Sequence, residues 1–317
     1  MPRKIIEKLI ELVVVLFVVS LGTFTLVSLI PGDPSVAILG EGRAPAEYAQ
    51  VRADLGLDDP FPVRYWDWLS GALQGDLGQS MTPPHADVTD SVGSALPVSI
   101  QLALMGLLFA IVVSVPLAMY SARHQGGWID RAISAGTFGI LSVPSFLAGL
   151  LLIMVMVNNL GWFPRSQWVR LSEDPAQNLY HAFLPALTIS LLEMAMFTRI
   201  LRSDLVTTLQ ENFILVAKAK GMSNTRLLLS DALRPSSFSL ITMIGVVIGS
   251  MIGSTVIVET LFSLPGMGSL IVRAAQEGDI PMVQGAVLII AAIYVIVNGV
   301  IDISYGYLDP RSRRAHV

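Results

Sequence analysis

The stretch PVSIQLALMGLLFAIVVSVPLAMYS, Pro97–Ser121, decides the class of fold, because it is apolar over its whole length and contains no charged residue. An α-helix rises 1.5 Å per residue, so about 20 apolar residues cross the roughly 30 Å hydrocarbon core of a bilayer. This stretch is long enough to do so. The sequence therefore predicts a transmembrane helix over Pro97–Ser121.

Five other apolar stretches of similar length occur along the chain. We expect spans at about residues 9–30, 133–157, 183–201, 238–261 and 283–303. The chain of 317 residues is 53% hydrophobic and only 14% charged, whereas soluble domains are about 25% charged. An apolar excess gathered in such runs predicts an all-α integral membrane protein with six transmembrane helices.

The segment between the first two spans, residues 31 to about 95, is polar and rich in Pro, Gly, Asp and Trp. We expect it to form a small extracytoplasmic cap with short helices near 45–55 and 63–73. The chain then divides into the first span with this cap (1–95), a five-helix transmembrane domain with a loop at about 203–236 (96–310), and a cytoplasmic tail (311–317).

Basic residues divide unequally between the two sides of the predicted bundle. Fourteen of the twenty lie at the termini or in the loops after the second and fourth spans. The other six are Arg43, Arg52, Arg64, Arg165, Arg170 and Arg273. Because cytoplasmic loops of membrane proteins carry an excess of Lys and Arg, both termini are predicted to be cytoplasmic.

Several kinds of chemistry are excluded by composition. The chain has no cysteine, which excludes disulfides, thiolate metal sites and cysteine nucleophiles, and its four histidines are scattered, so no metal site is predicted. The phosphate-binding pattern GxxxxGK[ST] is missing, since none of the four lysines follows a glycine. The spans offer no set of nucleophile, base or metal ligand for an intramembrane enzyme, so no residue is assigned a catalytic role.

Three glycines, Gly245, Gly249 and Gly253, recur at intervals of four residues in the fifth span. This spacing places them on one face of a helix, where the backbone of another helix can approach closely. The pattern predicts a packing seam within the chain or between subunits. A chance arrangement in an apolar helix is the alternative.

The loop between the fourth and fifth spans, SDLVTTLQENFILVAKAKGMSNTRLLLSDALRPS (203–236), is basic and not apolar enough to cross a membrane. It is predicted to form two short amphipathic helices around a break at Gly221, where glycine can supply a positive φ. The second helix should begin at Leu227–Leu229 and end at Pro235. The residues alone leave open a helix that fits a groove on a cytoplasmic partner and an ordinary solvated loop.

Part of this loop, AKAKGMSNTRLLLSDALRPS, resembles the coupling loop of binding-protein-dependent ABC importer permeases of the dipeptide/oligopeptide (peptide/nickel) type. Further motifs of that family recur in order: PGDP (31–34), SVPSF (142–146), GWFP (161–164), LPALT (184–188), RILRSDL (199–205) and VETLFSLPGMGSLIVRAAQEGDIPMVQG (258–285). Each motif alone is weak, but the ordered set covers essentially the whole chain. The broader family has EAA where this loop has Leu-Val-Ala (215–217), so no acidic anchor is assigned there.

The resemblance implies a non-catalytic permease subunit of an ATP-driven importer that moves dipeptides or oligopeptides across a bacterial plasma (inner) membrane into the cytoplasm. It implies a homologous second permease subunit, two ATP-binding subunits that hold ATP and Mg, an extracytoplasmic substrate-binding protein, surrounding lipid and no nucleic acid. The coupling loop would use Ala217, Lys218, Ala219, Lys220, Gly221, Met222, Ser223, Leu228 and Leu233. The alternatives are nickel chelates or glutathione-like substrates for the same machinery, and a proton-coupled secondary carrier.

Four residues are candidates for the transport pathway: Ser142, Pro144, Glu193 and Glu259. A charge in hydrocarbon costs at least about 2.5–3.5 kcal/mol, so an acidic residue within a span is a functional candidate. Glu193 either lines the pathway or pairs with a residue such as Arg199. Glu259 lies at the end of its span, where solvation or pairing is the alternative role.

Overall fold

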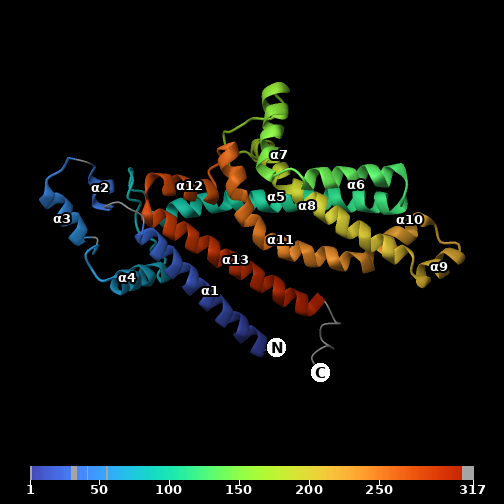
Figure 1. Cartoon of the computed structure of the whole chain (residues 1–317), viewed down its shortest axis with the longest axis horizontal. Coiled ribbons are helices and arrows are strands. Elements are labelled where there is room, and N and C mark those ends of the chain that lie inside the picture. The colour runs from blue at the N-terminus through green and yellow to red at the C-terminus, as the bar shows by residue number, and fades with distance from the viewer. Residues whose placement is uncertain (1, 30–33, 41, 55, 309–317) are drawn as a thin grey trace. The chain divides into compact units, whose positions relative to one another are not determined.

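The computed structural model describes residues 2–29, 34–40, 42–54 and 56–308, and within these ranges every regular element is helical (Figure 1). The all-α prediction is therefore confirmed. The tail at 311–317 and most of the PGDP motif lie outside the described residues. The elements are α1 (Pro2–Ser28), α2 (Pro34–Leu39), α3 (Pro45–Asp54), α4 (Phe61–Leu73), α5 (Val88–Arg123), α6 (Trp128–Leu141), α7 (Ser145–Leu152), η1 (Ile153–Asn159), α8 (Pro175–Leu209), α9 (Asn212–Ala219), α10 (Asn224–Arg226), η2 (Leu227–Ala232), α11 (Leu233–Phe262), α12 (Met267–Glu277) and α13 (Ile280–Leu308).

Four helical stretches are long and apolar enough to cross a membrane: Val88–Arg123, Pro175–Leu209, Asn224–Gly249 and Ile280–Ile301. Two bent helix pairs raise the number to six if each pair is counted as one span. The chain is thus an integral membrane protein with four to six candidate spans among the described residues. The prediction of six spans corresponds to α1, α5, α6 with α7, α8, α11 and α13, and this assignment stays a prediction.

The third predicted span is broken rather than continuous. Helix α6 ends before Ser142 and α7 begins after Pro144, and the two parts of the span are bent by 104°. Pro144, between the two helices, has φ −55° and ψ 138°, an extended conformation. Since a proline disfavours helical geometry in the residue before it, the helix stops there.

Pro235 does not end a helix, contrary to the prediction. Helical structure runs without interruption from α10 through η2 into α11, which contains Pro235 in its first turn. A proline inside a helix lacks an N–H, and its ring crowds the carbonyl four residues earlier. That carbonyl belongs to Asp231, within the π turn η2, where the hydrogen-bond pattern already departs from that of an α-helix. The wider turn therefore accommodates the ring.

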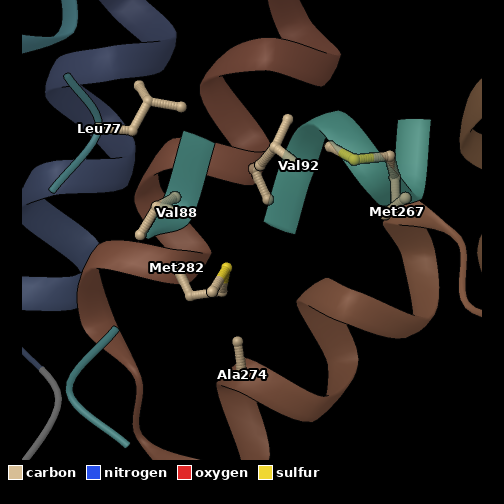
Figure 2. Close-up of a cluster of buried hydrophobic side chains, with 8 residues drawn as sticks. Leu77, Val88, Val92, Met267, Ala274 and Met282 are labelled. Carbon is tan, nitrogen blue, oxygen red and sulfur yellow. The ribbon is translucent and has the colours of Figure 1, made fainter. Parts of the chain in front are cut away.

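One compact unit combines the residues up to Ser99 with Pro265–Val300. Both predicted cap helices occur in it, as α3 and α4, and α2 is an additional short helix. The core of the unit contains Leu77 together with apolar side chains from the start of α5, from α12 and from α13 (Figure 2). Packing is tight, because a Cβ on Gly285 would lie 2.7 Å from Val88 Cγ1.

A buried carboxylate fixes the polar segment of this unit. Asp279, at the turn between α12 and α13, is 2% exposed. It accepts hydrogen bonds from the Ser80 hydroxyl and from the Met81 backbone N–H, the latter at 3.1 Å. These bonds join residues about 200 positions apart in the sequence and hold the segment before α5 against the α12–α13 turn.

The second compact unit contains Ile100–Leu264 and is organised around α8, against which α6, α7 and α11 pack (Figure 1). The buried face of α8 includes Phe197 and Leu201, both fully inaccessible. Gly149 of α7 permits a close approach: a Cβ there would lie 2.7 Å from Leu261 Cδ2 and 2.9 Å from Thr188 Cγ2. This packing supports the loop that joins α8 to α11.

Candidate functional site

The predicted break at Gly221 is a helix-ending turn. Gly221 has φ +85°, in the left-handed region that glycine adopts without strain. Its N–H bonds to the Lys218 carbonyl at 3.0 Å, and the Met222 N–H bonds to the Ala217 carbonyl at 3.3 Å. This pair of bonds is the Schellman arrangement that ends helices, so α9 stops where the sequence predicts.

A new helix begins directly after the turn. The Ser223 side chain accepts a hydrogen bond from the Arg226 N–H and caps α10. The loop is therefore an elbow made of two helical segments, α9 and α10 with η2, joined at Gly221. A Cβ on Gly221 would meet no atom within 4 Å, so this corner of the elbow faces open space.

Buried apolar side chains hold the elbow to the transmembrane helices. Ile214, Leu227 and Leu228 are each less than 7% exposed, and Ala232 is fully buried. Helix α9 packs against η2, and η2 packs against α8 and α11. The Ser236 hydroxyl bonds to that of Thr208 at 2.9 Å and joins α11 to α8 directly.

The outer surface of α9 combines apolar and basic side chains. Phe213, Leu215 and Val216 are each about half exposed, and Lys218 and Lys220 are exposed beside them. Exposed apolar side chains with a charged rim are typical of protein or membrane contact surfaces. Since Ile214 points inward, the buried and exposed faces of α9 have separate roles.

The structure brings seven of the predicted coupling residues, from Ala217 to Ser223, into the one elbow. Two others lie apart from its exposed corner. Leu228 is buried and anchors the elbow, and Leu233 is half-buried at the start of α11. The sequence pattern did not distinguish the buried residues that anchor the elbow from the residues exposed on its surface.

The three spaced glycines of α11 differ in their surroundings. Gly245 and Gly249 are buried, whereas Gly253 is exposed, and a Cβ on it would meet no atom within 4 Å. Close helix approaches in this unit also occur at Gly106 and Gly149. A role for the α11 glycines in a packing seam stays a prediction.

The four candidate pathway residues lie in two places. Ser142 and Pro144 lie at the bend between α6 and α7, where the Ser142 hydroxyl donates to the Phe138 carbonyl at 2.8 Å. Glu193 lies in the buried face of α8, and Glu259 is fully buried near the end of α11.

Glu193 does not pair with Arg199, which was one of its two predicted roles. Its Oε2 atom is buried and has no hydrogen-bond partner among the described residues. The Arg199 guanidinium instead lies over the Phe138 ring, 4.1 Å from its centroid. Glu193 as a pathway residue remains a prediction.

A buried ion pair that the sequence does not reveal lies near the end of α8. Arg202 donates from Nε to Asp130 Oδ1 at 2.6 Å and from Nη2 to Oδ2 at 2.7 Å. The same carboxylate accepts from the Ser121 hydroxyl at 2.5 Å and from the Gly126 N–H at 2.8 Å. We call these residues the Asp130 clamp. It joins the end of α5, the start of α6 and the part of α8 that leads into the elbow.

Two family models match this chain, and together they cover most of its length. Residues 114–314 match the family described as binding-protein-dependent transport system inner membrane component, and residues 1–103 match the corresponding N-terminal family. The oligopeptide transport system permease protein AppB of Bacillus subtilis is 33% identical over 313 residues, covering 98% of this chain and 99% of that protein.

Two other relatives have similar coverage. A Brucella abortus protein whose name assigns it to a peptide transport system is 32% identical, and the glutathione transport system permease protein GsiC of Escherichia coli is 31% identical. Each alignment covers 99% of both proteins. The chain therefore belongs to the family of inner membrane permease components of binding-protein-dependent transport systems.

Proposed function

We propose that this chain is a permease subunit of an ATP-driven importer that carries small peptides, dipeptides or oligopeptides, into the cytoplasm. The names of two relatives, in Bacillus subtilis and Brucella abortus, support peptides as the substrate class. The sequence has no nucleotide-binding pattern of its own. The energy source is accordingly a pair of separate ATP-binding subunits, which hold ATP and Mg.

The observation that carries this proposal is the construction of the elbow. Its corner at Gly221 faces open space, its α9 surface is apolar and basic, and its inner face is fixed to α8 and α11. When a partner bound to α9 moves on ATP binding, it displaces the adjoining ends of α8 and α11 together. The permease thus converts closure of the ATP-binding subunits into a change in access to the pathway.

The rest of the proposed assembly follows from the family. A homologous second permease subunit completes the pathway, and an extracytoplasmic substrate-binding protein delivers the peptide. Both termini and the elbow lie on the cytoplasmic side, as the distribution of basic residues favours. Six spans give this topology, with α1 as the first.

The proposal is tested by peptide uptake into proteoliposomes that contain the complete complex. Gly221→Trp should abolish uptake and the stimulation of ATP hydrolysis by the loaded binding protein, because the bulky side chain occupies the docking corner. The matched control is Gly161→Trp. Gly161 also has positive φ (+63°) and open space around its Cβ position. A tryptophan at either position should therefore cause similar backbone strain, about 1–2 kcal/mol.

Equal uptake by the two tryptophan variants would show that Gly221 has no specific role in docking the ATP-binding subunit. Membrane insertion and co-purification of all subunits are measured for both, so that a failure of assembly is separated from a failure of coupling.

Glutathione-like substrates are the second candidate, because the GsiC relative is named for glutathione. Competition distinguishes the two classes in the same proteoliposomes. Unlabelled oligopeptides should inhibit uptake of a labelled peptide, whereas inhibition by glutathione alone would favour the alternative.

A further inference from the structure

A groove between α6 and α8 has a composition that neither the elbow nor the pathway candidates explain. It encloses about 540 Å³. Both helices belong to the same compact unit and lie side by side (Figure 1). Its lining consists of Ser134, Phe138, Leu141, Met196, Arg199, Ile200, Arg202 and Ser203, which include no acidic residue.

Arg199 supplies an uncompensated positive charge in this groove. Its guanidinium lies over the Phe138 ring at 4.1 Å, and it forms no hydrogen bond or ion pair with any described residue. Stacking on an aromatic face fixes the plane of a guanidinium and leaves the N–H groups at its edges available. Arg202 differs, since two of its donors are bound to Asp130.

Two hydroxyl groups add further capacity for an anion. The side chains of Ser134 and Ser203 line the groove and make no hydrogen bond to any residue in the described part of the chain. The guanidinium and both hydroxyls can donate hydrogen bonds, and no carboxylate lines the groove beside them. Such a set suits a phosphate, which arginine binds through paired N–H···O bonds.

The rest of the groove is apolar, with Leu141, Met196 and Ile200 among its walls. The apolar run of α8 ends at Phe197, and the two arginines follow within one and a half turns. Arg199 is therefore near the end of the predicted fourth span (183–201), where we expect hydrocarbon to give way to headgroups. A ligand with an anionic head and an apolar body matches both halves of the groove, whereas a free anion matches only one.

We propose that this groove binds the phosphate headgroup of an anionic phospholipid from the cytoplasmic leaflet, with Arg199, Ser134 and Ser203 as donors. The choice of leaflet depends on the proposed orientation of the chain. Basic pockets between transmembrane helices are suited to such headgroups. The bound phosphate also neutralises the positive charge of Arg199, which lies one helical turn before Arg202 of the Asp130 clamp.

The test uses the complete complex, purified and depleted of lipid, with a photoactivatable phosphatidylglycerol as the probe. Cross-links mapped by peptide mass spectrometry should fall on α6 and α8 at the groove. Phosphatidylcholine should compete poorly, and soluble glycerol phosphate should not compete. Arg199→Gln should weaken retention of phosphatidylglycerol about tenfold or more, since it removes a charge-assisted interaction.

Two variants control for effects on folding and on overall charge. Arg199→Lys keeps the charge and should retain part of the affinity. Arg131→Gln removes an equal charge from an exposed position of α6 outside the groove and should leave affinity unchanged. Peptide uptake is measured on the same samples, so loss of the lipid site and loss of the proposed transport function are separate results.

Four outcomes would overturn the proposal. Cross-links elsewhere, or equal retention by Arg199→Gln and the parent, would show that the groove holds no lipid. Effective competition by glycerol phosphate would identify a site for a free anion. Displacement of the lipid by a transported peptide would assign the groove to the substrate instead.

Discussion

Replacing the two ionised residues of the Asp130 clamp, singly and together, gives a quantitative test of the packing around α8. The Asp130 side chain is 6% exposed and that of Arg202 is 27% exposed. Arg202→Met leaves a buried carboxylate without its partner, which costs about 3–5 kcal/mol. Asp130→Ala should cost less, about 2 kcal/mol, because water reaches the remaining guanidinium and replaces part of the lost hydrogen bonding.

The double variant should cost less than the two single variants added together, since no charge is then left unpaired. We expect a coupling energy of about 2 kcal/mol, within the range found for residues in contact. The assay is the unfolding free energy of the full chain in lipid bilayers, measured by steric trapping. Thermal aggregation of the detergent-purified chain serves as a second readout.

An exposed ion pair provides the matched comparison. Arg52 and Asp58 lie 2.7 Å apart, but their side chains are 39% and 63% exposed. Exposed pairs contribute at most about 1 kcal/mol. If the clamp couples no more strongly than this pair, or if its two single variants are simply additive, the reasoning from burial is refuted.

Three further substitutions have expected effects on stability. Gly149→Ala should destabilise the chain by about 1–3 kcal/mol, because the added methyl group overpacks against its close neighbours. Gly253→Ala is the control and should be neutral or stabilising, because its Cβ meets no atom within 4 Å. Equal melting temperatures for the two variants would contradict the packing described for α7. Asp279→Ala should lower the melting temperature and expose the segment around Ser80 to limited proteolysis, because the Ser80 hydroxyl and the Met81 N–H lose their buried acceptor. An unchanged cleavage pattern would show that other contacts hold this segment.

Much of the fold follows from local features of the sequence. Apolar runs predict the long helices, because a helix in lipid satisfies its own backbone groups. Gly221 predicts the end of α9, because glycine adopts a positive φ without strain. Features of this kind depend on neighbouring residues alone, so they can be read without knowing what packs against them.

Other features, most of which depend on distant residues, were missed or misread. Asp130 and Arg202 are 72 positions apart, and nothing in either local pattern indicates their pairing. Pro235 was expected to stop a helix, but the π turn before it accommodates the ring. The close packing at Gly149 was also missed, because no spaced pattern marks this glycine.

The candidate site shows the same division. The exposed corner of the elbow was predictable from the break at Gly221 and from the family motif around it. The distinction between Leu228, which anchors the elbow, and the exposed Val216 depends on tertiary packing. Sequence periodicity in so short a helix does not fix which face is buried.

We propose that an ATP-binding partner moves this permease through the elbow, and cysteine cross-linking is the most direct test of that contact. The chain has no cysteine, so Lys220→Cys introduces a single reactive thiol beside the exposed corner. In the complete complex, a short bifunctional reagent should link this thiol to an ATP-binding subunit and block peptide uptake, while Trp162→Cys on the opposite predicted side should form no such link. Full uptake by a complex in which Lys220→Cys never cross-links to an ATP-binding subunit, in any nucleotide state, would contradict the account.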